Sequence, residues 1–398
     1  MSARSVALLG ALLLAGTTQA QDQPYTPARA DSVLEQLTVP RLPGSAPLGE
    51  LRRQWLHQPR LLAPALAYAE SAIELGRREE DPRYFGQAQS ALQPWWSLAP
   101  PPPQVWLLRA RLALARQDFS TAGADLQALS VSPFPEAVQA QLTLANLHMM
   151  QSDAAAALSD CTALEHRVDA LVATTCRASA QALLGHAAPA LADLRAALQD
   201  SAERPLSVQL WSLSQAAEIA NRLGRDDQAE AFYRDALQRM DAAQLRDPNL
   251  LAAWADYRLQ RGDAAAVVQR LDSLQRLDTL LLRLAMARRQ LGADADPLVT
   301  RLSQRFSEMR QRGDSSHRRE EALFVLMLQN DPARALEAAQ KNWAVQREPM
   351  DARLLLLAAQ SAQQPQAAQP VVDWLATTGL EDRRLQALLA ALPKVVAP

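Results

Sequence analysis

The chain has 398 residues and a formal net charge of −2 at neutral pH. A charge so close to zero excludes the broad basic surface with which proteins usually bind nucleic acid, so we expect no nucleic-acid partner. Hydrophobic residues make up 48% of the chain and aromatic residues only 5%. The apolar content is therefore mostly alanine and leucine, which favour helix over sheet, and the composition predicts an all-α fold.

Residues 1–20 have the pattern of a secretory signal peptide. Arg4 supplies the positive charge, the stretch from Val6 to Ala15 is apolar, and residues 18–20 form a small-residue cleavage site. No later stretch reaches the ~20 apolar residues that a membrane-spanning helix needs. We therefore expect export to the periplasm, cleavage near Ala20 and no membrane insertion of the mature chain. An uncleaved N-terminal anchor is the alternative.

The segment from 21 to 58 is rich in proline. It is expected to be an irregular lead-in with one short helical pattern between Ala30 and Leu37. Folding proper is expected to begin in residues 59–102, where two amphipathic stretches predict a helical hairpin. The four prolines from Pro100 to Pro103 then favour a stiff polyproline joint before the next helix.

A turn glycine recurs at hairpin spacing in the middle of the chain, between alanine- and leucine-rich amphipathic stretches. It occurs as Gly185, Gly224, Gly262 and Gly292. When the glycine is placed at position 15 of a unit of about 34 residues, small or β-branched residues recur at positions 8 and 20. Small side chains there let the two helices of a hairpin approach closely. Residues 103–274 accommodate units that start at positions 103, 138, 171, 210 and 248.

These residues resemble the tetratricopeptide repeat (TPR), and the uneven spacing of the units indicates degenerate repeats. The resemblance implies an α-solenoid of antiparallel helical hairpins, a scaffold that binds other proteins or peptides. Residues 275–398 continue the hairpins in a less regular form. A last helix from Arg383 to Leu392 would cap the stack.

Cys161 and Cys176 are the only cysteines, and they lie equally far from the predicted bend between two antiparallel helices. This placement predicts a disulfide, because the cysteines of exported proteins are usually oxidised. The alternative is a soft-metal site, since His148, Met149 and two thiols together suit copper or zinc. The region has no Cys-x-x-Cys and no His-x-x-x-His spacing, so we expect no metal.

The sequence contains no motif of a known kind of catalytic site. We find no Gly-x-Ser-x-Gly elbow, no His-Glu-x-x-His helix and no glycine-rich phosphate loop. The histidines are spread widely along the chain. The sequence therefore predicts a protein that is not an enzyme and needs no cofactor.

The TPR resemblance also implies that fixed positions of each first helix line a concave groove. In this register they form a mixed, mildly polar set: Arg111, Asn146, Met149, Ser179, Trp211, Glu218, Asn221, Arg222 and Asp256. The groove has no concentrated run of lysine or arginine. We therefore expect it to hold an extended peptide, with Asn221 on the peptide backbone and Trp211 as an apolar anchor, and not an acidic tail. The plainer interpretation is a solvated helix face, with Trp211 as a packing residue.

The sequence thus predicts a non-catalytic scaffold or adaptor in the periplasm that binds a protein or peptide partner. The alternative is a metal- or solute-handling accessory that uses His148, Cys161 and Cys176. Two further possibilities stay open. The chain could self-associate through its end helix, and residues 21–58 could occupy the chain's own groove.

Overall fold

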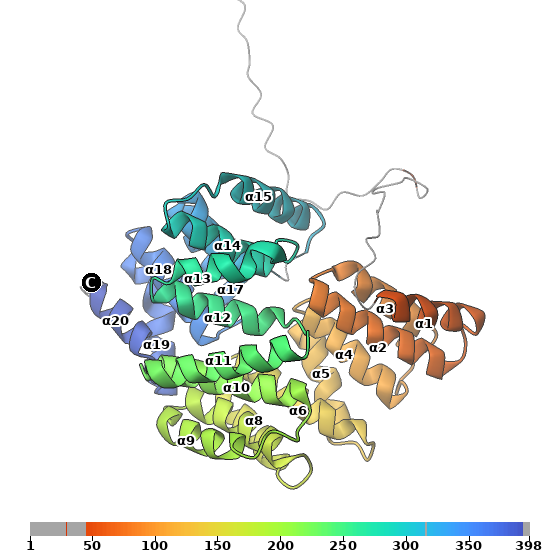
Figure 1. Cartoon of the computed structure of the whole chain (residues 1–398). Coiled ribbons are helices and arrows are strands. Elements are labelled where there is room, and N and C mark those ends of the chain that lie inside the picture. Colours follow the sequence, from red (N-terminus) through yellow and green to blue (C-terminus); the bar gives the residue numbers. More distant parts are fainter. Residues whose placement is uncertain (1–28, 30–44, 315–316, 393–398) are drawn as a thin grey trace, which may run out of the picture.

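The computed structural model describes Arg29, residues 45–314 and residues 317–392. Every regular element in these residues is a helix, and successive helices form antiparallel hairpins (Figure 1). The predicted all-α solenoid is therefore confirmed. The expected signal peptide and the helical pattern between Ala30 and Leu37 lie outside the described residues. None of the described helices is long and apolar enough to cross a membrane.

The helices divide into the first and second members of consecutive hairpins. The first members are α2 (Leu62–Glu79), α4 (Pro103–Ala115), α6 (Glu136–Met150), α8 (Ala170–Leu183), α10 (Leu206–Arg222), α12 (Pro248–Gln260), α14 (Asp278–Gln290), α16 (Arg318–Phe324) and α18 (Pro349–Ser361). Their partners are α3 (Pro82–Trp96), α5 (Phe119–Ser130), α7 (Ala154–Ala163), α9 (Ala187–Leu198), α11 (Asp226–Ala242), α13 (Ala264–Leu271), α15 (Asp296–Gln311), α17 (Pro332–Trp343) and α19 (Gln369–Thr378).

The remaining elements lie at the ends of the chain or extend a hairpin. Helix α1 (Ser45–His57) precedes the first hairpin, and α20 (Arg383–Ala391) follows the last. A π-helical turn, Val325–Gln329, extends α16. Short 3-10 turns at Asp272–Leu274 and Pro365–Ala368 follow α13 and precede α19.

The turn inside a hairpin depends on one residue in the left-handed region. Gly185 and Gly262 have φ values of +79° and +78°, which glycine adopts without a Cβ clash. In two earlier hairpins Gln117 and Ser152 adopt the same conformation. The residue that follows is often an aspartate whose side chain accepts a hydrogen bond from the backbone of the second helix. These N-caps are Asp118, Asp153 and Asp263.

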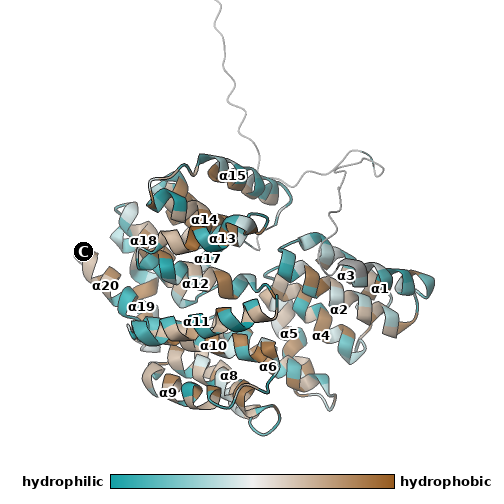
Figure 2. Ribbon diagram, viewed as in Figure 1, coloured by the Kyte–Doolittle hydropathy of each residue, from teal (hydrophilic) through white to brown (hydrophobic). Residues whose placement is uncertain are grey.

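The first helices form the inner layer of the solenoid, and the second helices form the outer layer. Successive first helices pack against one another, whereas each second helix packs on its own partner and most second helices also pack on the next first helix. Ala178 and Ala190, at the positions where two helices touch, are at most 1% exposed. Figure 2 shows hydrophilic residues over much of the outer surface of α11 and α15.

Helix α1 corrects the expectation that residues 21–58 are irregular. Leu48, Leu51 and Trp55 lie on one face of the helix and pack with α2, where the indole of Trp55 stacks on Tyr68 at a centroid distance of 5.1 Å. Pro47 does not prevent the helix, because it lies in the first turn, where proline removes no intrahelical hydrogen bond. Burial of this apolar face therefore outweighs the proline content of the segment.

The C-terminal hairpins lie along the turns of the earlier hairpins, so that the solenoid folds back on itself. The backbone amide of Arg347 donates to the carbonyl oxygen of Met150 at 2.8 Å, and the indole of Trp374 donates to the hydroxyl of Ser152. In Figure 1 the blue helices α18 to α20 lie on the same side of the molecule as one end of the green helices α11 and α12. These contacts join parts of the chain that are about two hundred residues apart.

Helix α20 does more than cap the stack. It packs against α18, and Nη1 of Arg384 donates to Oε1 of Gln260, at the end of α12, at 2.8 Å. A Cβ added to Gly224, in the turn after α10, would lie 2.8 Å from Nη1 of Arg383. Helix α20 therefore lies at the end of the stack, as the sequence predicts, and it also contacts hairpins in the middle of the chain.

The predicted disulfide is confirmed. Cys161 in α7 and Cys176 in α8 are bonded, with their Cα atoms 5.5 Å apart, and both side chains are buried. The bond joins the second helix of one hairpin to the first helix of the next. Leu164 and Ala180 are among the apolar residues buried around it.

Candidate binding groove

All the groove residues that the sequence indicated lie on inner-layer helices, namely α4, α6, α8, α10 and α12. Their exposure separates them into three groups. Asn146 and Glu218 are exposed. The half-buried members are Arg111, Met149, Trp211 and Asn221. The buried members are Ser179, Arg222 and Asp256. The repeat register thus finds the inner layer, but a partner can reach only some of the side chains that it selects.

Ser179 and Trp211 are engaged within the chain. The hydroxyl oxygen of Ser179 is 2.9 Å from the carbonyl oxygen of Thr175 and 3.0 Å from Oε1 of Gln215. Trp211 and Met149 pack, partly buried, against the apolar cluster around the disulfide. Neither Trp211 nor Met149 therefore presents its whole side chain to the groove.

Glu218 and Arg222 lie one turn apart on α10. Glu218 is open to solvent, yet the surrounding protein raises its pKa, because the desolvation outweighs the attraction of Arg222. Arg222 is 7% exposed, and its Nε and Nη1 have no hydrogen-bond partner among the described residues. Burial lowers the pKa of Arg222, an effect that the nearby charge of Asp382 only partly offsets. This part of the inner layer is crowded and strongly charged.

Asp256 forms a buried ion pair with Arg283 of α14. Nε of Arg283 donates to Oδ1 of Asp256 at 3.1 Å, and Nη2 donates to Oδ2 at 2.8 Å. Only 3% of Arg283 and 8% of Asp256 is exposed. Burial by itself would lower the pKa of Arg283, but the carboxylate of Asp256 raises it above its ordinary value. Asp256 therefore joins two hairpins and is not open to a partner.

The sequence analysis missed the inner residues of the C-terminal hairpins. Nε of Arg319 in α16 donates to Oδ1 of Asp351 in α18 at 2.6 Å, and Arg319 also pairs with Glu348. Burial would lower the pKa of Arg319, but the two carboxylates raise it well above its ordinary value. The rule that first helices line the groove would have pointed to these helices if it had been applied beyond Leu274.

The residues of the alternative metal site do not gather around one point. Both cysteines are in the disulfide, and Nδ1 of His148 is 2.7 Å from Oδ2 of Asp160. Within residues 45–314 and 317–392, no group of three or more His, Cys, Asp and Glu side chains could hold a metal ion. A disulfide sulfur is not a thiolate, so the cysteines offer no thiolate ligand in this state.

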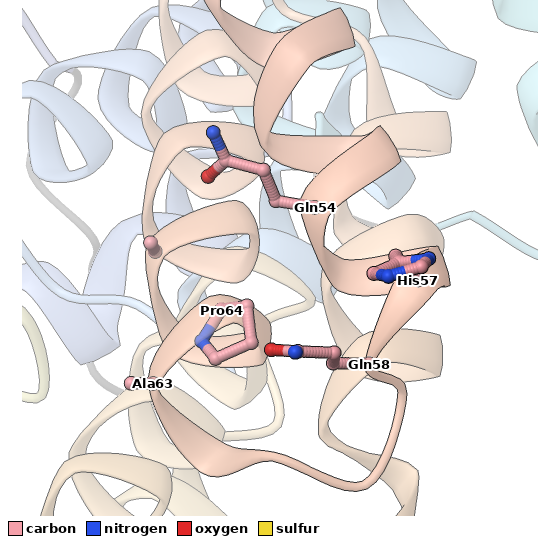
Figure 3. A pocket seen from close by; sticks show the side chains of 6 residues that line it. Gln54, His57, Gln58, Ala63 and Pro64 are labelled. Atoms are coloured by element: carbon pink, nitrogen blue, oxygen red, sulfur yellow. The ribbon is translucent and has the colours of Figure 1, made fainter.

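A separate hollow of about 470 Å³ lies where α1 meets α2 (Figure 3). The side chains of Gln54, His57 and Gln58 line one side of it, and Ala63 and Pro64 line the other. Its lining has no convergent charged groups and includes none of the residues that the repeat register selected. We therefore do not include it in the groove.

No protein-family model and no curated protein matches the chain. Among solved structures, the chain is similar to a Rap protein complexed with competence and sporulation factor, with a TM-score of 0.46, 12% identity, and 88% of this chain and 94% of that chain covered. It is also similar to Naa15/Naa10 bound to HypK-THB, with a TM-score of 0.25, 17% identity, and 87% and 63% covered. A third similar structure is the TPR domain of P58(IPK), with a TM-score of 0.21, 15% identity, and 88% and 92% covered.

The hairpins, their turns and their two-layer packing are features of this chain itself. Small residues lie where the helices of a hairpin meet, as Ala217 and Ala229 do with no exposed surface. Left-handed residues such as Gly185 close the hairpins. The chain is a TPR-like helical repeat protein.

Proposed function

We propose that this chain is an exported, non-catalytic scaffold that binds a protein or peptide partner on the inner layer of its solenoid. The observation that supports it is the row of first helices, which pack side by side and form a continuous surface. Asn146, Glu218 and Asn221 lie on this surface, and their side chains form no hydrogen bond to another helix among the described residues. Repeat scaffolds bind partners through extended surfaces of this kind.

The proposed location is the periplasm. The disulfide between Cys161 and Cys176 supports export, because such bonds persist mainly in oxidising compartments. The signal-peptide pattern of residues 1–20 supports the same route. Neither a catalytic motif nor a cofactor is part of the proposal.

The test is an affinity capture from envelope extract with residues 21–398 as bait. A groove variant carries Glu218→Arg and Asn221→Ala. The matched control carries Arg234→Glu and Gln238→Ala, two exposed positions on the outer helix α11. Thermal unfolding of all three proteins shows whether each is folded.

The proposal predicts a discrete partner that the wild type and the control both recover and the folded groove variant loses. Recovery of the same partner by all three proteins would move the interface away from the inner layer. If the wild type recovers no discrete partner, the scaffold proposal itself is contradicted.

A further inference from the structure

Exposed apolar side chains gather at one end of the first hairpins. Among the described residues, nine large apolar side chains are exposed, and five of them lie in or beside the connections that lead into α2, α4 and α6. Successive first helices pack side by side and start at the same end of the solenoid, so these three connections lie at that end. We call the five residues the apolar edge: Leu56, Leu61, Leu98, Val131 and Phe134.

Contacts between the helix ends hold the three connections together. Nε2 of Gln104, in the first turn of α4, donates to Oε1 of Glu136, the first residue of α6. Leu62, the first residue of α2, packs in the same apolar cluster as Trp95 and Trp96 at the end of α3. The loops that carry the apolar edge are therefore neighbours in space.

The apolar edge lies in a part of the chain that is poor in negative charge. The sequence has no aspartate or glutamate in residues 51–69, 82–117 or 126–135, and each of these ranges contains one of the three connections. In the connection between α1 and α2, His57 and Arg60 are exposed and basic. The edge therefore combines apolar side chains with a weak positive charge, which favours an anionic surface.

The later connections between hairpins have a different composition. Among the described residues, Leu245 is the only large apolar side chain exposed in the connections that lead into α8, α10, α12 and α18. Each of these connections also contains both an arginine and a carboxylate: Arg167 with Asp169, Arg204 with Glu203, Arg246 with Asp247, and Arg347 with Glu348. An uncharged apolar loop is thus a property of the first hairpins and not of the repeat.

The loops of the apolar edge offer a protein partner few hydrogen-bonding side chains. Ser132 is the only polar side chain in residues 131–135, and its hydroxyl donates to the carbonyl oxygen of Leu129 at 2.7 Å. In residues 97–102 the only polar side chain is Ser97. Interfaces between proteins usually carry a polar rim with about one hydrogen bond per 100–200 Å². These loops match a surface that requires no such bonds.

We propose that the apolar edge docks on the surface of a lipid bilayer that carries anionic headgroups. Separate apolar tips fit the boundary between headgroups and acyl chains, which needs no complementary groove, whereas a carboxylate at that depth is costly. Arg60 adds attraction to the headgroup phosphates. Trp95 and Trp96, half-buried beneath the loop of Leu98, are of the residue type that the interface favours. The contact is peripheral and involves loops alone.

This docking goes beyond the proposed scaffold function and does not depend on it. The apolar edge lies where the first helices begin, whereas Asn146 and Asn221 lie near the opposite ends of α6 and α10. A chain docked by this edge therefore keeps those inner-layer side chains open. The scaffold would hold its partner next to the membrane surface.

The test measures co-sedimentation of residues 21–398 with vesicles of phosphatidylethanolamine and phosphatidylglycerol. The edge variant carries Leu98→Ser and Val131→Ser, at positions that are 49% and 83% exposed. The matched control carries Leu245→Ser and Leu291→Ser, at positions in later hairpins that are 49% and 51% exposed. Thermal unfolding checks that each protein is folded, and sedimentation velocity without vesicles measures self-association.

The proposal predicts that the wild type and the control bind the vesicles and that the edge variant binds about tenfold or more weakly, because two apolar side chains no longer enter the interface. A separate variant, Arg60→Gln, should bind about fivefold more weakly at low salt, since one basic side chain near an anionic surface contributes about this factor. Rising salt should remove the difference between Arg60→Gln and the wild type.

Absence of vesicle binding by the wild type, or equal binding by the wild type, the control and the edge variant, would overturn the lipid proposal. Self-association of the wild type that the edge variant loses, without vesicle binding, would also overturn it and would identify a second copy as the occupant. The edge variant should still capture the partner of the inner layer. Failure of that capture by every protein, with vesicle binding retained, contradicts the scaffold function alone.

Discussion

A substitution at Gly185 tests whether the C-terminal hairpins contact the turn between α8 and α9, as the fold requires. The φ of Gly185 is +79°, and a Cβ at this position would lie 2.7 Å from the carbonyl oxygen of Gly379, in the turn after α19. An alanine there meets two penalties. The left-handed backbone costs about 1–2 kcal/mol, and overlap with a backbone atom, which cannot move aside like a flexible side chain, adds about 1–3 kcal/mol. We expect Gly185→Ala to lower the free energy of unfolding by about 2–5 kcal/mol.

Gly292→Ala is the matched control. Gly292 has a φ of +68°, but a Cβ there would meet no atom within 4 Å, so only the backbone penalty of about 1–2 kcal/mol applies. Urea unfolding followed by far-UV circular dichroism measures both losses. Hydrogen exchange of α19 and α20 should become faster in Gly185→Ala and stay unchanged in Gly292→Ala. Equal losses and unchanged exchange in both variants would refute the contact with Gly379.

Three further predictions concern the disulfide, the buried ion pair and the inner carboxylate. Reduction of the bond between Cys161 and Cys176, which are 15 residues apart, should lower the free energy of urea unfolding by about 3 kcal/mol. The reductant should not affect a Cys161→Ala, Cys176→Ala variant, and an equal response of both proteins would contradict this. Asp256→Ala should cost about 3–5 kcal/mol, because it removes the close carboxylate partner of the buried Arg283 and leaves only Glu320 at 3.9 Å, whereas Asp256→Leu with Arg283→Met should recover much of that loss in the same assay. If the double variant is as unstable as Asp256→Ala, the unpaired charge of Arg283 does not explain the loss of stability. The folded state raises the pKa of Glu218, so its stabilising contribution is complete below about pH 4.3 and is lost as the pH rises through the folded pKa. The free energy of unfolding of the wild type, measured with urea, should therefore fall with rising pH relative to that of Glu218→Gln. Parallel pH profiles of the two proteins would contradict the raised pKa.

Features that depend on residues close together in the chain could be predicted. Gly185 and Gly262 mark hairpin turns, because the left-handed conformation strains most other residues. Cys161 and Cys176 lie equally far from one bend between antiparallel helices, and this local symmetry is enough to predict the disulfide. The apolar spacing in Ser45–His57 also indicates helix α1, but the proline content of the segment favoured an irregular structure instead.

The candidate site could be predicted only in part. The repeat register selected residues on the first helices of the hairpins, since a register depends on which face of a helix meets its hairpin partner. It could not tell that Asp256 is paired with Arg283, or that α20 lies near Arg222, because these contacts join different hairpins. Nor could it tell that Glu218, although exposed, lies near charged residues of the C-terminal hairpins such as Glu348.

The sequence by itself determined an all-α, TPR-like helical repeat fold with a disulfide, because helix periodicity, turn glycines and cysteine placement act over a few turns of chain. Tertiary structure alone decided which inner side chains are open and which are buried. Small rotations between successive hairpins add up along the solenoid, so no single residue determines where its later hairpins arrive. Arg283, Arg319 and Arg353 line one cavity because the first helices of three successive hairpins, α14, α16 and α18, pack against one another.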